Sequence, residues 1–282
     1  MSGQRPETSF LHLIPVILTL FISFILSLLL YMSRLSLPQP VITPAPEPPA
    51  EAPPEQALTN ISPYINALIV VGLIFLGSFI LITIVSRYRI LLRIFIFSIL
   101  GIIAFSTSLF FLEISPQFSS SYNILASMLI TLAILFVVYR GIELASVVGL
   151  SYVAAAAGTI LGFSIPFWTA IVLVLLISAY DVYAMFRGHL RALASEDSHN
   201  LQGLMMDFRG VSIGLGDLFF YSILLAFAIA NFSIVSGIMT SLGILIGFYL
   251  TLQLLKKWRA VPGLPISLIL GLALAYVSLA IG

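Results

Sequence analysis

Long runs of apolar residues, separated by short polar segments, make up most of the chain. A helix that crosses the hydrocarbon core of a bilayer needs roughly 20 apolar residues, each adding a rise of about 1.5 Å. Runs of this length predict an all-α, polytopic membrane protein with nine transmembrane helices, in which residues 1–282 form a single membrane-embedded domain. The predicted spans lie near residues 10–31, 63–85, 90–111, 122–139, 142–162, 164–186, 210–231, 233–254 and 263–281.

The composition agrees with this prediction and excludes several functions. Of the 282 residues, 60% are hydrophobic and 8% are charged, and the mean hydropathy is +1.16. Charged residues make up about 25% of a typical soluble domain. A net charge of +1 without a dense basic patch argues against a nucleic-acid partner. The chain has no cysteine and its three histidines are scattered, so we expect neither a metal site nor a cofactor.

The basic residues are divided unequally between the two sides that nine spans would create. Eleven of the twelve lie on the side of the N-terminus, and only Arg34 lies on the other. Loops rich in lysine and arginine remain in the cytoplasm. The distribution therefore predicts a cytoplasmic N-terminus and an external C-terminus. A different number of spans would not separate the basic residues in this way.

Residues 34–60 form a proline-rich linker between the first two predicted spans. The segment contains eight prolines from Pro38 to Pro54. Such a composition cannot bury a core, so we expect an extended or disordered segment on the external side. A solvated tether is a simpler interpretation than a segment that recruits a partner.

Two aspartates, Asp181 and Asp217, lie inside apolar runs that contain no lysine or arginine. An ionised carboxylate in hydrocarbon costs at least ~2.5 kcal/mol. If both runs are helical from their cytoplasmic ends, Asp181 lies roughly 9 Å and Asp217 roughly 12 Å deep, on adjacent antiparallel helices. Two facing carboxylates in such a site share one proton. The ionised one can then activate water while the protonated one donates to an amide carbonyl, which is the chemistry of peptide hydrolysis.

Glycines and tyrosines surround the two carboxylates in the sequence. Gly214-Leu215-Gly216 precedes Asp217, and glycine permits close backbone approach. Tyr180 precedes Asp181, while Tyr183 and Tyr221 lie within about a turn of a carboxylate. Their hydroxyls are suited to orienting water or a carboxyl group, although packing explains Tyr183 and Tyr221 equally well.

The segment Pro262-Gly263-Leu264-Pro265 opens the last predicted span at nearly the same depth as the aspartates. Two prolines around a glycine disfavour a regular first helical turn. Backbone groups freed in this way can pair with an extended substrate, as in the addition of a strand to a sheet edge. Proline is also common at helix starts, so the motif gains its meaning from its position near both aspartates.

Taken together, these motifs resemble the presenilin and signal-peptide-peptidase family of intramembrane aspartyl proteases. That family has nine spans, a YD motif in the sixth, GxGD in the seventh and PAL at the ninth. The matching residues here are Tyr180-Asp181, Gly214-Leu215-Gly216-Asp217 and Pro262-Gly263-Leu264. The resemblance implies catalysis by Asp181 and Asp217, and contacts between the substrate and the other residues of these motifs.

The resemblance also implies partners and a cellular location. The orientation is similar to the presenilin side of the family, so the expected substrates are single-span membrane proteins with an external N-terminus, cleaved within the lipid bilayer. The compact chain suggests a microbial homologue in the cell membrane. Gly263 replaces the alanine of the family motif, and the loop 187–209 is short and lacks the long hydrophobic segment that presenilins cleave in themselves. We therefore expect an intact single chain without an obligatory protein partner.

Other functions remain open at this point. A proton-coupled secondary transporter would use the same two aspartates as a relay. Transporters usually carry paired repeats with broken helices, whereas the irregular features here lie in the C-terminal third. A prepilin-type peptidase shares the GxGD motif but not the nine-span pattern, and two purely structural carboxylates are a further alternative.

Overall fold

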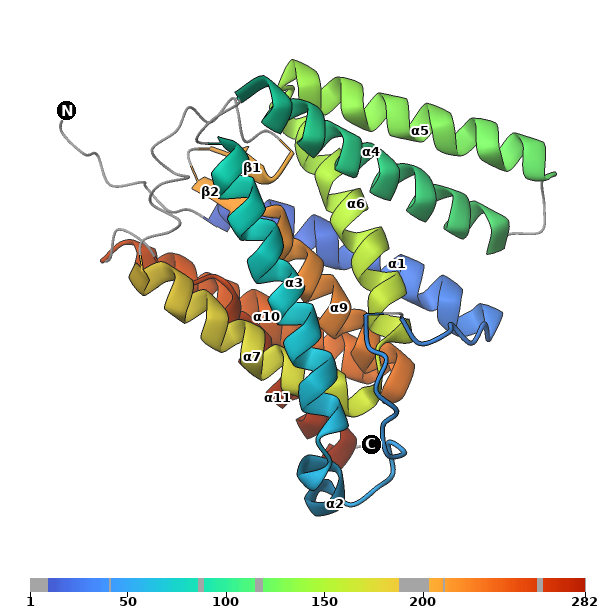
Figure 1. The fold of residues 1–282 in the computed structure, drawn as a ribbon, viewed down its shortest axis with the longest axis vertical. Coiled ribbons are helices and arrows are strands. Elements are labelled where there is room, and N and C mark those ends of the chain that lie inside the picture. The colour runs from blue at the N-terminus through green and yellow to red at the C-terminus, as the bar shows by residue number, and fades with distance from the viewer. Residues whose placement is uncertain are drawn as a thin grey trace.

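The protein is a bundle of long helices with one short β-hairpin (Figure 1). The computed structural model describes residues 10–40, 42–85, 89–114, 119–187, 203–209, 211–257 and 261–281. The predicted loop 187–209 therefore lies mostly outside the described residues.

Each predicted span corresponds to a helix of the described chain, and the ends differ by a few residues except at 210–231. The bounds are α1 (Ile14–Ser33, preceded by the short 3-10 turn η1, Phe10–Leu13), α3 (Ser62–Val85), α4 (Arg89–Ile114), α5 (Ser120–Arg140), α6 (Glu143–Ser164), α7 (Phe167–Arg187), α9 (Leu215–Asn231), α10 (Ile234–Leu255) and α11 (Leu264–Ile281). Within the described residues, six of these helices are long and apolar enough to cross a membrane, and α3, α9 and α11 contribute shorter apolar stretches. The prediction of an all-α polytopic membrane protein is thereby confirmed at the level of fold class.

The distribution of side chains is that of a protein in lipid. Large apolar side chains such as Phe21, Ile102 and Leu129 are exposed on the outside of the bundle, while small hydroxyl side chains are buried inside it. Ser23 of α1 and Thr159 of α6, for example, are fully buried and their hydroxyl oxygens lie 2.9 Å apart. Hydroxyl contacts of this kind join helices where lipid provides no hydrophobic driving force.

Helix α9 occupies the centre of the bundle and contacts α1, α6, α10 and α11 (Figure 1). Its contact with α6 depends on glycine: a Cβ added to Gly158 would lie 2.5 Å from Cβ of Ser222, and one added to Gly162 would lie 2.5 Å from the carbonyl oxygen of Ile223. Gly243 and Gly247 bring α10 equally close to α11. Small residues in membrane helices allow this close approach of backbones.

The proline-rich linker has little regular structure, as expected, but it is not a freely solvated tether. It contains one short helix, α2 (Pro54–Thr59), and its Glu47 carboxylate accepts hydrogen bonds from the backbone amides of Trp168 and Thr169, both at 3.1 Å. Asn66 of α3 donates to the same carboxylate at 3.2 Å. The first turn of a helix leaves amides without partners, and a carboxylate is favoured there. The linker thus joins the N-terminal ends of α3 and α7.

The segment before α9 corrects the predicted span at 210–231. Residues Val211–Gly214 form strand β2, which pairs antiparallel with β1 (Met205–Phe208), and the helix begins only at Leu215. The alternation of buried and exposed side chains along β2 explains the strand, since Val211 and Ile213 are buried and Ser212 is exposed. Apart from this hairpin, the regular elements of the described residues are helices.

Candidate active site

Asp217 lies in the first turn of α9, directly after the hairpin. The backbone of Gly214 is extended, and the amide of Leu215 donates to the carbonyl oxygen of Leu204 at 2.9 Å, which continues the pairing of the hairpin into the helix start. The expectation that Asp217 lies about two helical turns into a span is therefore wrong. The hairpin, rather than helix depth, sets the position of its carboxylate.

Asp181 lies six residues before the end of α7. Its Oδ2 accepts a hydrogen bond from the backbone amide of Leu264, the first residue of α11, at 3.0 Å. The amide of the preceding residue, Gly263, also interacts with this carboxylate. Helix α11 therefore directs its free N-terminal amides at Asp181.

Asp217 reaches the same dipeptide from the opposite helix. A Cβ placed on Gly263 would lie only 2.7 Å from Oδ2 of Asp217, so the carboxylate occupies the space that any larger residue would need. The two carboxylates interact electrostatically. Helices α7 and α9 contact each other little, whereas α11 packs against both. The dyad is thus assembled around the start of α11 and not by direct packing of the two aspartate helices.

Backbone groups of the Pro262-Gly263-Leu264 segment already form hydrogen bonds within the protein, which the sequence did not predict. The Gly263 carbonyl oxygen accepts from the hydroxyl of Tyr221 at 2.9 Å and from Ser267 at 3.3 Å, and the Leu264 amide is bound to Asp181. These two groups are therefore not free to pair with a substrate, contrary to expectation. The two groups instead form hydrogen bonds within the protein.

The remaining predicted residues surround the dyad to different degrees. Gly214 lies beside Asp217, since a Cβ placed on it would be 3.7 Å from the carboxylate, and Gly216 has no atom within 4 Å of its added Cβ. Tyr180 is half-buried, and its ring meets Phe75 of α3 edge-on with 6.5 Å between centroids. Tyr183 is 47% exposed. Helix α3 thus covers the Asp181 side of the site.

Two residues, Tyr221 and Ser267, form hydrogen bonds at the site that the sequence did not predict. Tyr221 is fully buried, and its hydroxyl contacts the Gly263 carbonyl and lies 3.2 Å from Oγ of Ser267. A spacing of four residues places Tyr221 on the same face of α9 as Asp217, which was the available signal. Ser267 is likewise four residues after Gly263, so its hydroxyl lies beside the Gly263 carbonyl.

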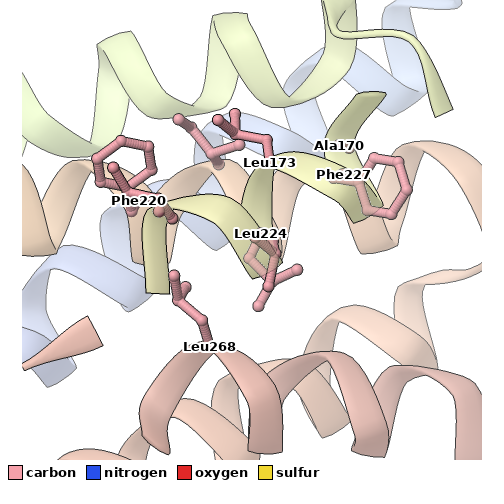
Figure 2. Close-up of a pocket in the computed structure, with 9 residues that line it drawn as sticks. Ala170, Leu173, Phe220, Leu224, Phe227 and Leu268 are labelled. Carbon is pink, nitrogen blue, oxygen red and sulfur yellow. The ribbon is translucent and has the colours of Figure 1, made fainter. Parts of the chain in front are cut away.

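A narrow apolar gap lies between α7, α9 and α11 (Figure 2), and its lining residues Ile177 and Phe220 are about one helical turn along the chain from Asp181 and Asp217. The volume of this cavity is only about 10 Å³. Leu224 and Leu268 approach each other across it, near Phe220 and Leu173 (Figure 2). Among the described residues no cluster of three or more histidine, aspartate or glutamate side chains is arranged to hold a metal ion.

Comparison with known proteins finds a family that matches part of this site. The Presenilin family profile matches residues 191–281, which include Asp217 and the Pro262-Gly263-Leu264 segment. The C-terminal third of the chain is therefore similar to presenilins. The resemblance drawn from its three motifs is thereby confirmed.

Curated presenilins and solved structures agree with this assignment. The chain is 34% identical to Presenilin-B of Dictyostelium discoideum over 126 residues, which cover 40% of this chain and 26% of that protein. It is 38% identical to the presenilin homolog of Drosophila melanogaster over 92 residues, covering 32% and 17% of the two chains. The matched stretches thus span about a quarter or less of these relatives.

The solved structures extend the likeness to the whole fold. Two structures of a presenilin family intramembrane aspartate protease match with TM-scores of 0.65 and 0.66 at 19% and 18% identity. They cover 96% and 99% of this chain and 99% and 100% of theirs. The chain is accordingly a multi-pass integral membrane protein.

Proposed function

We propose that this presenilin-family protein is an intramembrane aspartyl endopeptidase that cleaves peptide bonds within the transmembrane segments of single-span proteins. The observation that carries the proposal is the convergence of Asp181 and Asp217 on the Gly263-Leu264 dipeptide. A structural role would not require two carboxylates to meet in an apolar bundle, where each is costly. A hydrolytic role requires them to meet.

The contacts suggest a role for each carboxylate. Hydrogen bonds from backbone amides stabilise the ionised form of a carboxylate, and Asp181 accepts such a bond from Leu264. Asp181 is therefore the base that takes a proton from water, and Asp217 is the acid that donates to the carbonyl oxygen of the scissile amide. Collapse of the tetrahedral intermediate then needs a proton on the leaving nitrogen, which the newly protonated Asp181 supplies, while a hydroxyl of the intermediate returns its proton to Asp217.

A substrate helix hides its peptide bonds, so the proposal includes an extended segment held beside β2. The bond between Leu215 and Leu204 implies that Met206 and Ile213 also exchange bonds, because hydrogen-bonded pairs alternate along an antiparallel ladder. Ser212 and Gly214 then direct their backbone groups away from β1. A substrate strand paired there would pass Gly214, Leu215, Gly216 and the dyad, with Tyr180 and the Pro262-Leu264 segment on its other side.

The topology forms part of the proposal. Nine crossings with a cytoplasmic N-terminus agree with the distribution of basic residues and would place the dyad near the cytoplasmic side. The protein would then act in the lipid bilayer, in the cell membrane of a prokaryote, on single-span substrates with an external N-terminus, as one chain without an obligatory partner.

The proposal is tested by incubating the purified protein in liposomes with a single-span reporter and identifying the products by mass spectrometry. Cleavage within the span by the wild type, and its loss in Asp181→Asn and Asp217→Asn, is the expected result. Glu113→Gln, a carboxylate-to-amide change at an exposed position of α4, is the matched control and should cleave normally. Full cleavage by either aspartate variant refutes the mechanism. Aspartate-dependent proton flux without products would favour the transporter.

A further inference from the structure

One tyrosine, Tyr221, lies beside the dyad on α9, the helix that carries Asp217. The ring of Tyr221 is fully buried and packs edge-on against Phe248, with 6.4 Å between centroids. Its hydroxyl donates to the carbonyl oxygen of Gly263 at 2.9 Å and lies 3.2 Å from Oγ of Ser267. A buried phenol needs such a partner, but the partner found here belongs to the active-site backbone.

The carbonyl that accepts a hydrogen bond from Tyr221 and the amide that donates one to Asp181 belong to the same peptide group. The C=O of Gly263 and the N–H of Leu264 lie in one plane and point in opposite directions, because the peptide between them is trans. Tyr221 and Ser267 hold the oxygen end of this plane, and Asp181 accepts at the nitrogen end. Fixing the oxygen therefore fixes the direction in which the N–H points.

The same arrangement strengthens the bond to Asp181. Hydrogen bonds in series polarise one another, so donors to the Gly263 oxygen make the Leu264 N–H a better donor. The chain of contacts runs from Tyr221 on α9, through the first peptide of α11, to Asp181 on α7. Each of the three helices supplies one member.

We propose that Tyr221 is a positioning residue for Asp181, acting through the Gly263-Leu264 peptide plane with the help of Ser267. This inference rests on the proposed protease function and deepens it, since it concerns how the base is held. Without the phenol hydroxyl, the peptide plane can rotate, and the Asp181 carboxylate loses its orientation toward the attacking water. A misplacement of about 1 Å in such a constellation can cost roughly 100-fold in rate.

The test compares Tyr221→Phe with a matched variant elsewhere in the bundle. Tyr221→Phe removes only the hydroxyl and keeps the ring. Tyr152→Phe removes a similar phenol, which lies 2.9 Å from the hydroxyl of buried Ser108 at the contact of α6 with α4. Both variants lose a tyrosine–serine contact, but only Tyr221→Phe also loses a hydrogen bond to the backbone beside the dyad.

The expected result separates positioning from stability. In Tyr221→Phe, kcat should fall by roughly 10- to 100-fold while KM changes less than about twofold, because the substrate-binding surface is untouched. The affinity for a hydroxyl-bearing transition-state analogue should fall with kcat. Tyr152→Phe should keep kcat, and its change in melting temperature gives the stability cost of losing a tyrosine–serine contact away from the dyad.

Each other outcome has a defined meaning. If the wild type does not cleave, or if Asp217→Asn does, the proposed function itself fails. If the wild type cleaves and Tyr221→Phe retains kcat, or if its loss of activity only matches a loss of folded protein, the positioning role is overturned. Ser267→Ala provides a second reading if Tyr221→Phe does not fold: a smaller fall in kcat at constant KM is expected, and an unchanged kcat overturns the inference.

Discussion

Gly263 is the position at which a very small change should have a large effect on activity. Alanine at 263 adds a Cβ 2.7 Å from Oδ2 of Asp217, closer than real Cβ contacts come. The backbone of Gly263 is outside the left-handed region, so alanine itself introduces no backbone strain. The only adjustment is that Asp217 and the start of α11 must separate by several tenths of an ångström.

The size of the effect follows from that displacement. A shift of 1 Å in a catalytic geometry can cost roughly 100-fold, so a shift of about half that size should lower kcat on the order of tenfold. The carboxylate is the free end of a side chain, and alanine reduces the entropy of the unfolded chain. The free energy of unfolding should therefore change by less than about 1 kcal/mol.

The assay is cleavage of a single-span reporter by Gly263→Ala, with kcat and KM measured beside the melting temperature. Gly72→Ala on α3 is the control, because its added Cβ meets nothing within 4 Å. The substitution restores the alanine of the family motif, so arguments from consensus predict an unchanged or higher rate. An unchanged or higher rate would refute the reasoning that Gly263 makes room for Asp217.

Three further predictions concern the linker, the helix packing and the dyad. Glu47→Gln should lower the free energy of unfolding by roughly 1–2 kcal/mol, because it removes the negative charge that binds the first-turn amides of α7. Glu51→Gln, at an exposed position of the linker, should leave the free energy of unfolding unchanged. Equal melting temperatures for the two variants in thermal denaturation would contradict this prediction. Gly158→Ala should cost about 1–3 kcal/mol, because its Cβ would lie 2.5 Å from Ser222, and a neutral result in the same assay would show that α6 and α9 separate easily. Since catalysis needs one proton on the pair, the pH–rate profile should fall on both sides of an optimum, and a rate that stays flat into the acid range would exclude the dyad mechanism.

The sequence predicted the membrane helices well because their signal is local. The apolar runs place α1 and α10 within a few residues of their observed bounds, and a run of about 20 apolar residues has few alternatives in a bilayer. The motif order also identified Asp181, Asp217 and the Pro262-Gly263-Leu264 segment, which the structure brings together. These were predictions from composition and spacing along the chain.

The parts that the sequence could not predict depend on contacts between distant segments. Strand β2 is as apolar as the helix that follows it, and only its pairing with Met205–Phe208 distinguishes the two. Glu47 acts on an α7 amide more than 120 positions away, so the linker composition gave no sign of it. The use of the Gly263 carbonyl by Tyr221 depends on the crossing of α9 and α11, which apolar periodicity does not specify.

The most direct test of the central claim is an experimental structure of the protein with a hydroxyl-bearing transition-state analogue. The hydroxyl stands in for the attacking water at the tetrahedral centre. Our account predicts that it lies within about 3 Å of a carboxylate oxygen of both Asp181 and Asp217, with the Leu264 amide still bound to Asp181. An analogue hydroxyl that contacts one aspartate while the other points away from it would contradict the account.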